Sequence, residues 1–426
     1  MVASMTTKTM TSSTQSFDTT AYPHIKEQIL YWVNQFDICS FLDNHQYQQK
    51  IPGMECLAAA GAVSSISTSL QEVDAHISYN KGWLFGHLNY EWKATVPDSI
   101  GFRPFFFYEP ETVLQLKDRQ LTILSFTKNP ANIFQEIMAI NPSHVYPEQK
   151  ISIQQRIDKN TYIHDIEKIQ SHIQRGDCYE LNYCMEFFAD KVACEGIHLY
   201  QSLSNISPVP FACFYKQDNA ELICASPERF LKKRDDQLLS QPIKGTIKRS
   251  LSDPKADQLL KETLQQSSKD KSENVMVVDM VRNDFSRLCK EGTVEVEELF
   301  SVYSFPQVHQ MISSIRGTLK KCIRFSDIIE ATYPMGSMTG APKHKVMQLI
   351  EAYEHTPRGL FSGAVGYIDP SGDFDFNVVI RSLFYNRQTQ QLRYLVGSGI
   401  TIYSDPATEY EECLLKAKAL TKVLGH

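Results

Sequence analysis

A lysine framed by apolar residues and glycine is the first candidate for chemistry in this chain. Lys244 follows Pro242 and Ile243 and precedes Gly245. Burying an ammonium without a partner is costly, and burial favours the neutral amine, which can act as a nucleophile. A solvated lysine in a turn would fit the same four residues. Lys244 therefore becomes a candidate nucleophile only if other segments build a site around it.

Three glutamates and a lysine lie on two expected helices. Glu409, Glu412 and Lys416 fall at i, i+3 and i+7 of a helix expected over residues 406–424, so they share one face. Glu273 lies next to apolar residues in the first turn of another expected helix. A surface salt-bridge ladder and a glutamate that complements the helix dipole are the structural alternatives. A carboxylate that binds a metal is the functional alternative for Glu273.

Two glycine-containing segments could approach a substrate through their backbones. The segment Gly397–Gly399 ends an expected strand ahead of a helix, where backbone N–H groups can bind an anion. The segment Tyr333–Lys343 holds two glycines and two prolines before another helix, which is typical of a loop that lines a pocket. Ordinary turn geometry would also account for either segment.

The elements that must position these residues can be read from periodicity and turn signals. Strands are expected at residues 82–90, 102–108, 178–188, 211–215, 221–225, within 294–315, and at 363–368, 377–385 and 392–403. Helices are expected at residues 161–176, 254–266, 273–281, 341–353 and 406–424, the last opened by Asp405 and Pro406. Because strands and helices do not alternate strictly, the pattern favours an α+β fold.

Composition excludes several classes of protein. The chain has 426 residues, 42% of them hydrophobic and 22% charged, with a net charge of -6. That charge argues against a nucleic-acid-binding protein, and no apolar run is long enough to span a bilayer. Ten scattered cysteines without a Cys-x-x-Cys pair predict reduced thiols and a cytoplasmic protein. The first 20 residues, rich in Ser and Thr, predict a disordered tail and lack the apolar core of a secretory signal.

Taken together and in this order, the segments resemble the chorismate-utilising enzymes over about residues 158–424. The matching segments are Ser226–Phe230, Pro242–Thr246, Glu273 with Val278–Asp284, Thr339–Lys343, Gly363–Tyr367, Ile380–Ser382, Gly397–Gly399 and Glu409–Lys416. The resemblance implies a four-layer α/β/β/α sandwich, in which two large antiparallel sheets pack orthogonally with helices outside. It also implies a division into a tail (1–20), an N-terminal strand-rich region that shares the same core (21–155) and a chorismate-binding catalytic region (156–426).

The resemblance also assigns roles to individual residues. It places Mg2+ at Glu273 and Glu412, with Glu409 nearby. The residues that it implies for substrate binding are Arg381, Lys416, Gly397, Ser398, Gly399, Thr339, Gly340 and Tyr367.

The catalytic residues implied by the resemblance are Lys244, Glu228, Thr246 and His309. Lys244 would attack C2 of chorismate as a neutral amine. Glu228 would protonate the departing 4-hydroxyl and then accept a proton from ammonia. Thr246 and His309 would orient the ring and the hydroxyl, although a histidine with satisfied partners in the core would also suit His309.

Lysine at position 244 favours the aminodeoxychorismate synthase component I branch, which serves para-aminobenzoate and folate synthesis, over anthranilate synthases, which carry alanine there. Isochorismate and salicylate synthases place a water-activating lysine where this chain has Tyr179–Asn182. Glu180 within that segment departs from the glutamine usual in the family. A catalytically silent scaffold of an amidotransferase complex is an alternative of another class, and the intact catalytic set argues against it.

No glutaminase nucleophile motif is visible in the sequence. Ammonia is therefore expected from solution or from a separate glutamine amidotransferase subunit, which the resemblance implies as a partner.

Overall fold

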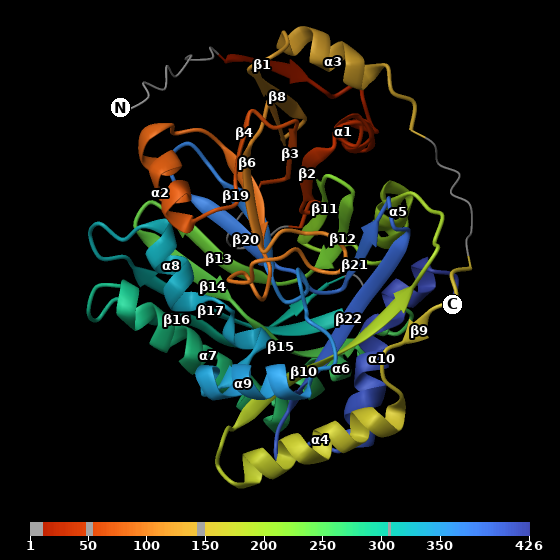
Figure 1. Ribbon diagram of the computed structural model, residues 1–426, viewed down its shortest axis with the longest axis vertical. Coiled ribbons are helices and arrows are strands. Elements are labelled where there is room, and N and C mark those ends of the chain that lie inside the picture. The colour runs from red at the N-terminus through yellow and green to blue at the C-terminus, as the bar shows by residue number, and fades with distance from the viewer. Residues whose placement is uncertain (1–11, 48–53, 143–149, 306–307) are drawn as a thin grey trace.

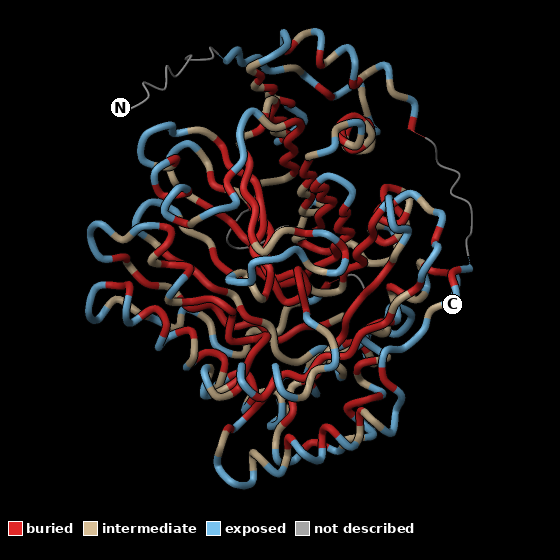
Figure 2. Tube along the Cα trace, viewed as in Figure 1, coloured by how far each residue is buried: buried red, intermediate tan, exposed pale blue. Residues whose placement is uncertain are grey.

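The computed structural model describes residues 12–47, 54–142, 150–305 and 308–426. Two antiparallel sheets form its centre, with twelve and ten strands among these residues. The strands are largely buried, whereas the helices alternate between buried and exposed faces around them (Figures 1 and 2). The predicted α+β fold with two large antiparallel sheets and outer helices is confirmed.

The twelve-stranded sheet contains the first and the last strand of the described chain. Its order is β1 (Ser13–Asp18), β8 (Gln120–Ser125), β7 (Thr112–Lys117), β3 (Cys56–Ala60), β2 (Ile38–Asp43), β11 (Phe211–Gln217), β12 (Ala220–Ser226), β21 (Ser382–Asn386), β22 (Gln391–Ile400), β10 (Glu180–Ala189) and β18 (Gly340–Ala341), and β9 (Gln154–Gln155) also pairs with β10.

The ten-stranded sheet is built mainly from the middle of the chain. Its order is β15 (Ile243–Lys248), β17 (Val308–Thr318), β14 (Gln237–Gln241), β13 (Arg229–Arg234), β20 (Phe374–Val378), β19 (Ala364–Ile368), β5 (Leu84–Leu88), β6 (Phe105–Glu109) and β4 (Ser64–Ile66), and β16 (Glu295–Ser304) also pairs with β17.

The helices surround the sheets (Figure 1). They are α1 (Ile25–Val33), α2 (Leu70–Tyr79), α3 (Pro130–Met138), α4 (Lys159–Gln174), α5 (Gly196–Ile206), α6 (Pro254–Gln266), α7 (Ser268–Leu288), α8 (Phe325–Thr332), the short 3-10 helix η1 (Gly336–Met338), α9 (Lys343–Tyr353) and α10 (Pro406–Val423). Among the described residues, no helix is long and apolar enough to cross a membrane.

Strand alternation divides the interior into two hydrophobic clusters. On β3, Ala58 and Ala60 join the cluster under the outer helices, whereas Leu57 and Ala59 join the cluster between the sheets. Successive side chains on a strand point to opposite faces, so a strand covered on both faces is apolar throughout. This explains why the central strands read as continuous apolar runs.

The N-terminal region contributes strands to both sheets. β2 pairs with β11, and β5 pairs with β19, so strands far apart in the sequence are direct neighbours. The segment predicted as a tail differs from the prediction, because Ser13–Asp18 form β1 and pair with β8. A Ser- and Thr-rich sequence can form such a strand at an exposed sheet edge, where the partner strand supplies the hydrogen bonds. Residues 1–11 lie outside the described residues.

The helix that carries Glu273 is longer than predicted. α7 begins at Ser268, where the Ser267 side chain accepts a hydrogen bond from the backbone N–H of Asp270. Glu273 therefore lies in the second turn of the helix. Residues 282–284, expected to close the helix, lie inside it, and the Asp284 carboxylate accepts a hydrogen bond of 2.8 Å from Lys343. By contrast, α6 spans its predicted range.

A buried arginine joins three segments around β10. Arg358 is 1% exposed and pairs with Glu354 at 2.6 Å. Its guanidinium also donates to the carbonyls of Met338 and Asn182, at 2.6 and 2.7 Å. We expect Arg358→Met to lower the free energy of unfolding by about 3–5 kcal/mol, because it leaves the buried Glu354 carboxylate without its partner.

Urea denaturation of the Arg358→Met variant checks this expectation. The matched control is Arg316→Met, because Arg316 is 42% exposed and pairs with Glu297 on the surface. We expect the control to lose less than about 1 kcal/mol. Equal losses in the two variants would contradict a special role for the buried pair.

Candidate active site

Lys244 and Glu180 form a buried ion pair between the two sheets. The Lys244 Nζ atom lies 2.6 Å from Glu180 Oε1, and the two side chains are only 10% and 3% exposed. β15 of the ten-stranded sheet carries the lysine, and β10 of the twelve-stranded sheet carries the glutamate. The apolar-flanked lysine is therefore enclosed, and it has a partner of opposite charge.

The surrounding carboxylates hold Lys244 in its charged form. Burial acts against the ammonium, but the charges of Glu180, Glu273 and Glu228 outweigh burial and raise the pKa of Lys244 well above its usual value. These charges favour the ammonium form, and the neutral amine expected in the reaction stays a prediction. A nucleophilic role requires that Lys244 first give up a proton, and Glu180 is the acceptor in contact with it.

Glycines of β22 make room for this pair. A Cβ atom on Gly399 would lie 2.6 Å from Glu180 Oε1 and 3.2 Å from Lys244 Nζ. A Cβ on Gly397 would lie 2.6 Å from Cys184 Sγ. The glycines were expected in a loop at a strand end, but they lie inside β22 and pair with β10. Tertiary crowding, which no local turn signal reports, is the reason for glycine at these positions.

Ser398, between the two glycines, is directed away from the pair. It is fully buried, and its hydroxyl lies 3.1 Å from the Tyr162 hydroxyl of α4. Successive residues of a strand face opposite sides of the sheet. Ser398 therefore packs under the outer helices, and the predicted substrate contact does not follow from its position.

Glu228 is a buried carboxyl group beside Lys244. It lies between β12 and β13, is 4% exposed, and has a pKa raised to about 7 by burial. A hydrogen bond from Ser337 and the charges of Lys244 and Arg381 oppose that rise. A carboxyl group with a pKa near 7 can both donate and accept a proton at neutral pH.

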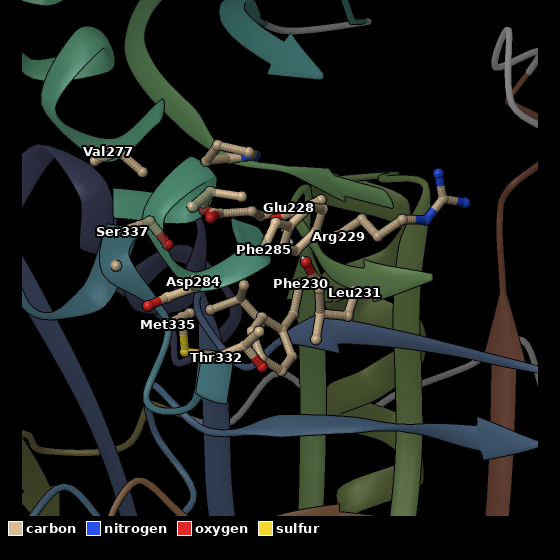
Figure 3. Close-up of a pocket in the computed structure, with 15 residues that line it drawn as sticks. Glu228, Arg229, Phe230, Leu231, Val277, Asp284, Phe285, Thr332, Met335 and Ser337 are labelled. Carbon is tan, nitrogen blue, oxygen red and sulfur yellow. Dashed lines mark hydrogen bonds between the residues drawn. The ribbon is translucent and has the colours of Figure 1, made fainter. Parts of the chain in front are cut away.

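A cavity of about 20 Å³, enough for about one water molecule, lies beside Glu228. Ser337 and Asp284 also line it, and the side chain of Arg229 extends away from it (Figure 3). Small polar species therefore have space next to the Glu228 carboxyl group.

Arg381 supplies a half-buried cation next to Glu228. It follows β20 with a φ of 51°, a conformation that non-glycine residues seldom adopt. Burial lowers the pKa of Arg381, and the charge of Glu228 opposes that effect. Within the described residues, its guanidinium makes no hydrogen bond or ion pair with another side chain. Its fork of donors is therefore free for a substrate carboxylate.

Thr339 and Gly340 support the site through their backbones. The carbonyl of Thr339 accepts a 2.7 Å hydrogen bond from the N–H of Asn182, and its hydroxyl donates to the carbonyl of Met335. Gly340 pairs with β10 at a φ of 145°, where a side chain would collide with the carbonyl of Glu180. These residues fix the start of β10, and thereby Glu180.

The three glutamates predicted around the metal meet at one lysine. Lys269 Nζ lies 3.2 Å from Glu409, 3.8 Å from Glu412 and 4.0 Å from Glu273. α7 supplies Lys269 and Glu273, and α10 supplies the other two glutamates. Lys269 was missed in the sequence, although its i,i+4 spacing to Glu273 was a usable signal.

The carboxylate set has unused capacity for a cation. Glu273 Oε1 and Glu409 Oε2 are buried and have no hydrogen-bond partner. Burial raises the pKa of Glu273 to about 7, with a further rise from Glu180 opposed by Lys244 and Lys269. A few carboxylates plus water and substrate oxygens are the usual ligands of Mg2+, so the types of these residues suit the ion. Among the described residues, no three Asp, Glu, His or Cys side chains lie close enough together to hold a metal ion, and the three glutamates are instead spaced around Lys269.

Lys416 contacts both the glutamates and the glycine strand. Its Nζ atom lies 2.8 Å from Glu412 Oε1 and donates a 3.0 Å hydrogen bond to the carbonyl of Gly397. The charges of Lys416, Lys269 and Lys244 together outweigh burial and lower the pKa of Glu412. α10 thus brings a cation to the edge of the Lys244 site.

Thr246 and His309 contact other partners. Thr246 is exposed on β15, and its hydroxyl accepts a 3.4 Å hydrogen bond from Gln310. His309 is 1% exposed, and its ring nitrogens lie 2.9 Å from the Ser304 hydroxyl and 3.2 Å from Asp257. No contact among the described residues joins either side chain to Lys244, so their orienting roles stay predictions.

Tyr367 lies in an aromatic cluster. Its ring is 5.8 Å from that of Trp83 and 6.2 Å from that of Phe85, measured between centroids. These contacts account for the aromatic side chain through packing. The predicted substrate contact of Tyr367 gains no support from its surroundings.

A comparison with known families gives a match over most of the chain. The chorismate binding enzyme family matches residues 29–422. This chain belongs to the chorismate binding enzymes. The buried Lys244, Glu228 and glutamate set thus lie in the part of the chain that the family covers.

Among relatives of this chorismate binding enzyme is a probable aminodeoxychorismate synthase, chloroplastic, from Oryza sativa subsp. japonica, 39% identical over 269 residues. That alignment covers 62% of this chain but only 30% of the rice protein. An anthranilate synthase component I-like protein of Synechocystis is 31% identical over 366 residues, 83% of this chain and 75% of its own length.

A solved structure shares the fold. The menaquinone-specific isochorismate synthase MenF of Escherichia coli matches with a TM-score of 0.78 and 17% identity, over 97% of this chain and 94% of MenF. At that identity, the likeness concerns the architecture of the chorismate binding enzymes alone.

Proposed function

We propose that this chorismate binding enzyme is the component I of an aminodeoxychorismate synthase, a Mg2+-dependent transferase that converts chorismate and ammonia to 4-amino-4-deoxychorismate. The observation that carries the proposal is the buried Lys244, enclosed with Glu180 and next to Glu228, whose pKa is raised to about 7 by burial. A lysine amine in an enclosed site can form a covalent intermediate with its substrate. The relative from rice supports the same product.

In the proposed first step, Lys244 passes a proton to Glu180, and its neutral amine bonds to C2 of chorismate. Both ring double bonds shift as the C4–O bond breaks, and Glu228 gives its proton to the departing hydroxyl, which leaves as water. In the second step ammonia bonds to C4, both double bonds shift back, and the C2–N bond to Lys244 breaks. Glu228 accepts the proton that the new amine loses, and Glu180 returns its proton to the Lys244 amine, which restores the enzyme.

The substrate is a dianion and needs cations for both carboxylates. Glu273 and Glu412 would hold Mg2+, with Glu409 nearby, and the ion would neutralise one carboxylate and the leaving oxygen. Arg381 and Lys416 would bind the other carboxylate, together with the backbone of Gly399. Arg381 supports this role because its donors have no side-chain partner among the described residues.

Ammonia would come from solution or from a glutamine amidotransferase subunit, the partner that the resemblance implies. The product would then enter para-aminobenzoate and folate synthesis in the cytoplasm.

A second candidate is anthranilate synthase component I. The Synechocystis relative favours it, because that alignment covers more of this chain than the alignment with the rice protein. The two functions differ in the carbon that receives nitrogen, C4 in one and C2 in the other.

The test is to incubate the purified chain with chorismate, ammonium and Mg2+ and to identify the product by chromatography and mass spectrometry. Formation of 4-amino-4-deoxychorismate supports the proposal. Anthranilate as the main product would replace it by the second candidate, and no turnover of chorismate would overturn both.

Replacing Glu180 by Gln is expected to make Lys244 lose its proton at lower pH. Glu180 is the leading charge that raises the pKa of Lys244, so its removal should lower that pKa by about one unit or more. The measurement is the pH dependence of Lys244 acetylation by acetic anhydride without chorismate, followed by peptide mass spectrometry. Glu351→Gln, an exposed position on α9, is the control. An unchanged midpoint in Glu180→Gln would show that Glu180 does not control the amine.

A further inference from the structure

We infer that Lys269 is a built-in cation of the glutamate set, and that a divalent ion must displace its ammonium to bind there. This inference rests on the metal assignment within the proposed function. It goes further by giving Lys269 a role: its ammonium holds the three glutamates together until the ion replaces it.

The Lys269 ammonium forms a hydrogen bond with only one of the three glutamate carboxylates. Lys269 Nζ makes a hydrogen bond of 3.2 Å with Glu409 Oε1, whereas Glu412 and Glu273 lie at 3.8 and 4.0 Å, beyond hydrogen-bond length. Glu409 is 2% exposed and Glu273 is 9% exposed, and each keeps one buried oxygen without a partner. An unpaired buried carboxylate oxygen is costly, so the set retains a strong preference for a further or stronger cation.

A divalent ion would meet that need better than the ammonium. It carries twice the charge and accepts about six oxygen ligands, including oxygens on different carboxylates. The ammonium has three donors on one atom and cannot bond to all three glutamates at the observed distances. The two cations would compete for the same carboxylates, because their mutual repulsion at short range opposes binding of both.

Lys269 is placed so that it can leave. It is the second residue of α7 and is 53% exposed, although its ammonium touches a buried carboxylate. Its flexible stem can carry the charge into water at little cost. Glu412 would keep a counter-charge during the exchange, because Lys416 lies 2.8 Å from it on the same helix.

The test is Mg2+ binding to Lys269→Gln, measured by isothermal titration calorimetry without chorismate. We expect the variant to bind Mg2+ at least about tenfold more tightly than the unchanged protein, because the competing charge is gone. We also expect its melting temperature to be lower in EDTA and to rise further on addition of Mg2+. Lys271→Gln, two residues along α7 with its ammonium over the Phe300 ring, is the matched control and should bind as the unchanged protein does.

Unchanged or weaker binding by Lys269→Gln would overturn the inference, as would the absence of Mg2+ binding by both proteins. If Lys269→Gln does not fold, Lys269→Arg decides: it keeps the charge, so affinity should stay within about threefold, and a tenfold gain would overturn the inference. The readout does not depend on the product. Tighter binding together with anthranilate formation would support this inference while the proposed function failed.

Discussion

Lys244→Ala is expected to reduce formation of 4-amino-4-deoxychorismate by at least about a thousandfold, because the covalent route loses its nucleophile. Ammonia could then reach C2 directly, so residual amination should shift toward a 2-amino product. The measurement is product analysis with chorismate, Mg2+ and ammonium in excess. Formation of the 4-amino product at the unchanged rate would show that Lys244 is not a covalent catalyst.

Two controls separate chemistry from folding in the Lys244→Ala experiment. Lys248→Ala removes an exposed lysine from the same strand, β15, and should keep full activity. Lys244→Ala leaves the Glu180 carboxylate buried without its partner, which costs stability. The double variant Lys244→Ala/Glu180→Gln removes that cost, so it should regain stability but not the 4-amino product.

Glu228→Gln is expected to stabilise the protein at pH 8 while it lowers activity by about 10²–10⁴-fold. The pKa of Glu228 rises from an ordinary 4.5 to about 7 in the folded protein. A carboxyl group with a raised folded pKa binds more protons folded than unfolded, so its contribution to stability falls as pH rises from about 4.5 to 7. Glutamine does not ionise, and the variant should gain up to about 3 kcal/mol relative to the unchanged protein above pH 7.

Urea denaturation of both proteins at pH 4.5 and pH 8 measures this gain. At pH 4.5 the two should differ little, because Glu228 is largely protonated in the folded protein. Glu351→Gln, on the exposed face of α9, should show no gain at either pH. If Glu228→Gln is equally stable or less stable at pH 8, ionisation of Glu228 does not destabilise the folded protein.

Local sequence signals predicted helices that hold the site, whereas the roles of individual residues were implied by the resemblance and stay predictions. Asp405 caps α10 as expected, with its carboxylate accepting from the N–H of Thr408, and α10 then presents Glu409 and Glu412 together. Helix caps and i,i+3 spacing depend only on neighbouring residues. The enclosure of Lys244 did not follow from its neighbours alone, because a solvated lysine in a turn would fit the same residues.

Local sequence patterns could not predict which distant segments contact each other. Glu180 precedes Lys244 by 64 residues, and Lys269 precedes Glu409 by 140. The partners of Lys244 and Lys269 are therefore determined by the order of strands in the sheets and by the packing of the helices. The same reason explains the charged state of Lys244, since the glutamates that hold its proton come from other elements. It also explains why the Gly399 position inside a strand resembled a loop.

The interleaved order of strands has a consequence for how the chain can be divided. β2 covers one edge of β11, and β5 covers one edge of β19. A piece beginning at residue 156 would contain Lys244 and the glutamates, but it would expose the N–H and C=O groups of two long central strands. We therefore expect that residues 156–426 do not fold as a separate soluble domain. They depend on the N-terminal strands, although those strands contribute none of the groups proposed to carry the reaction.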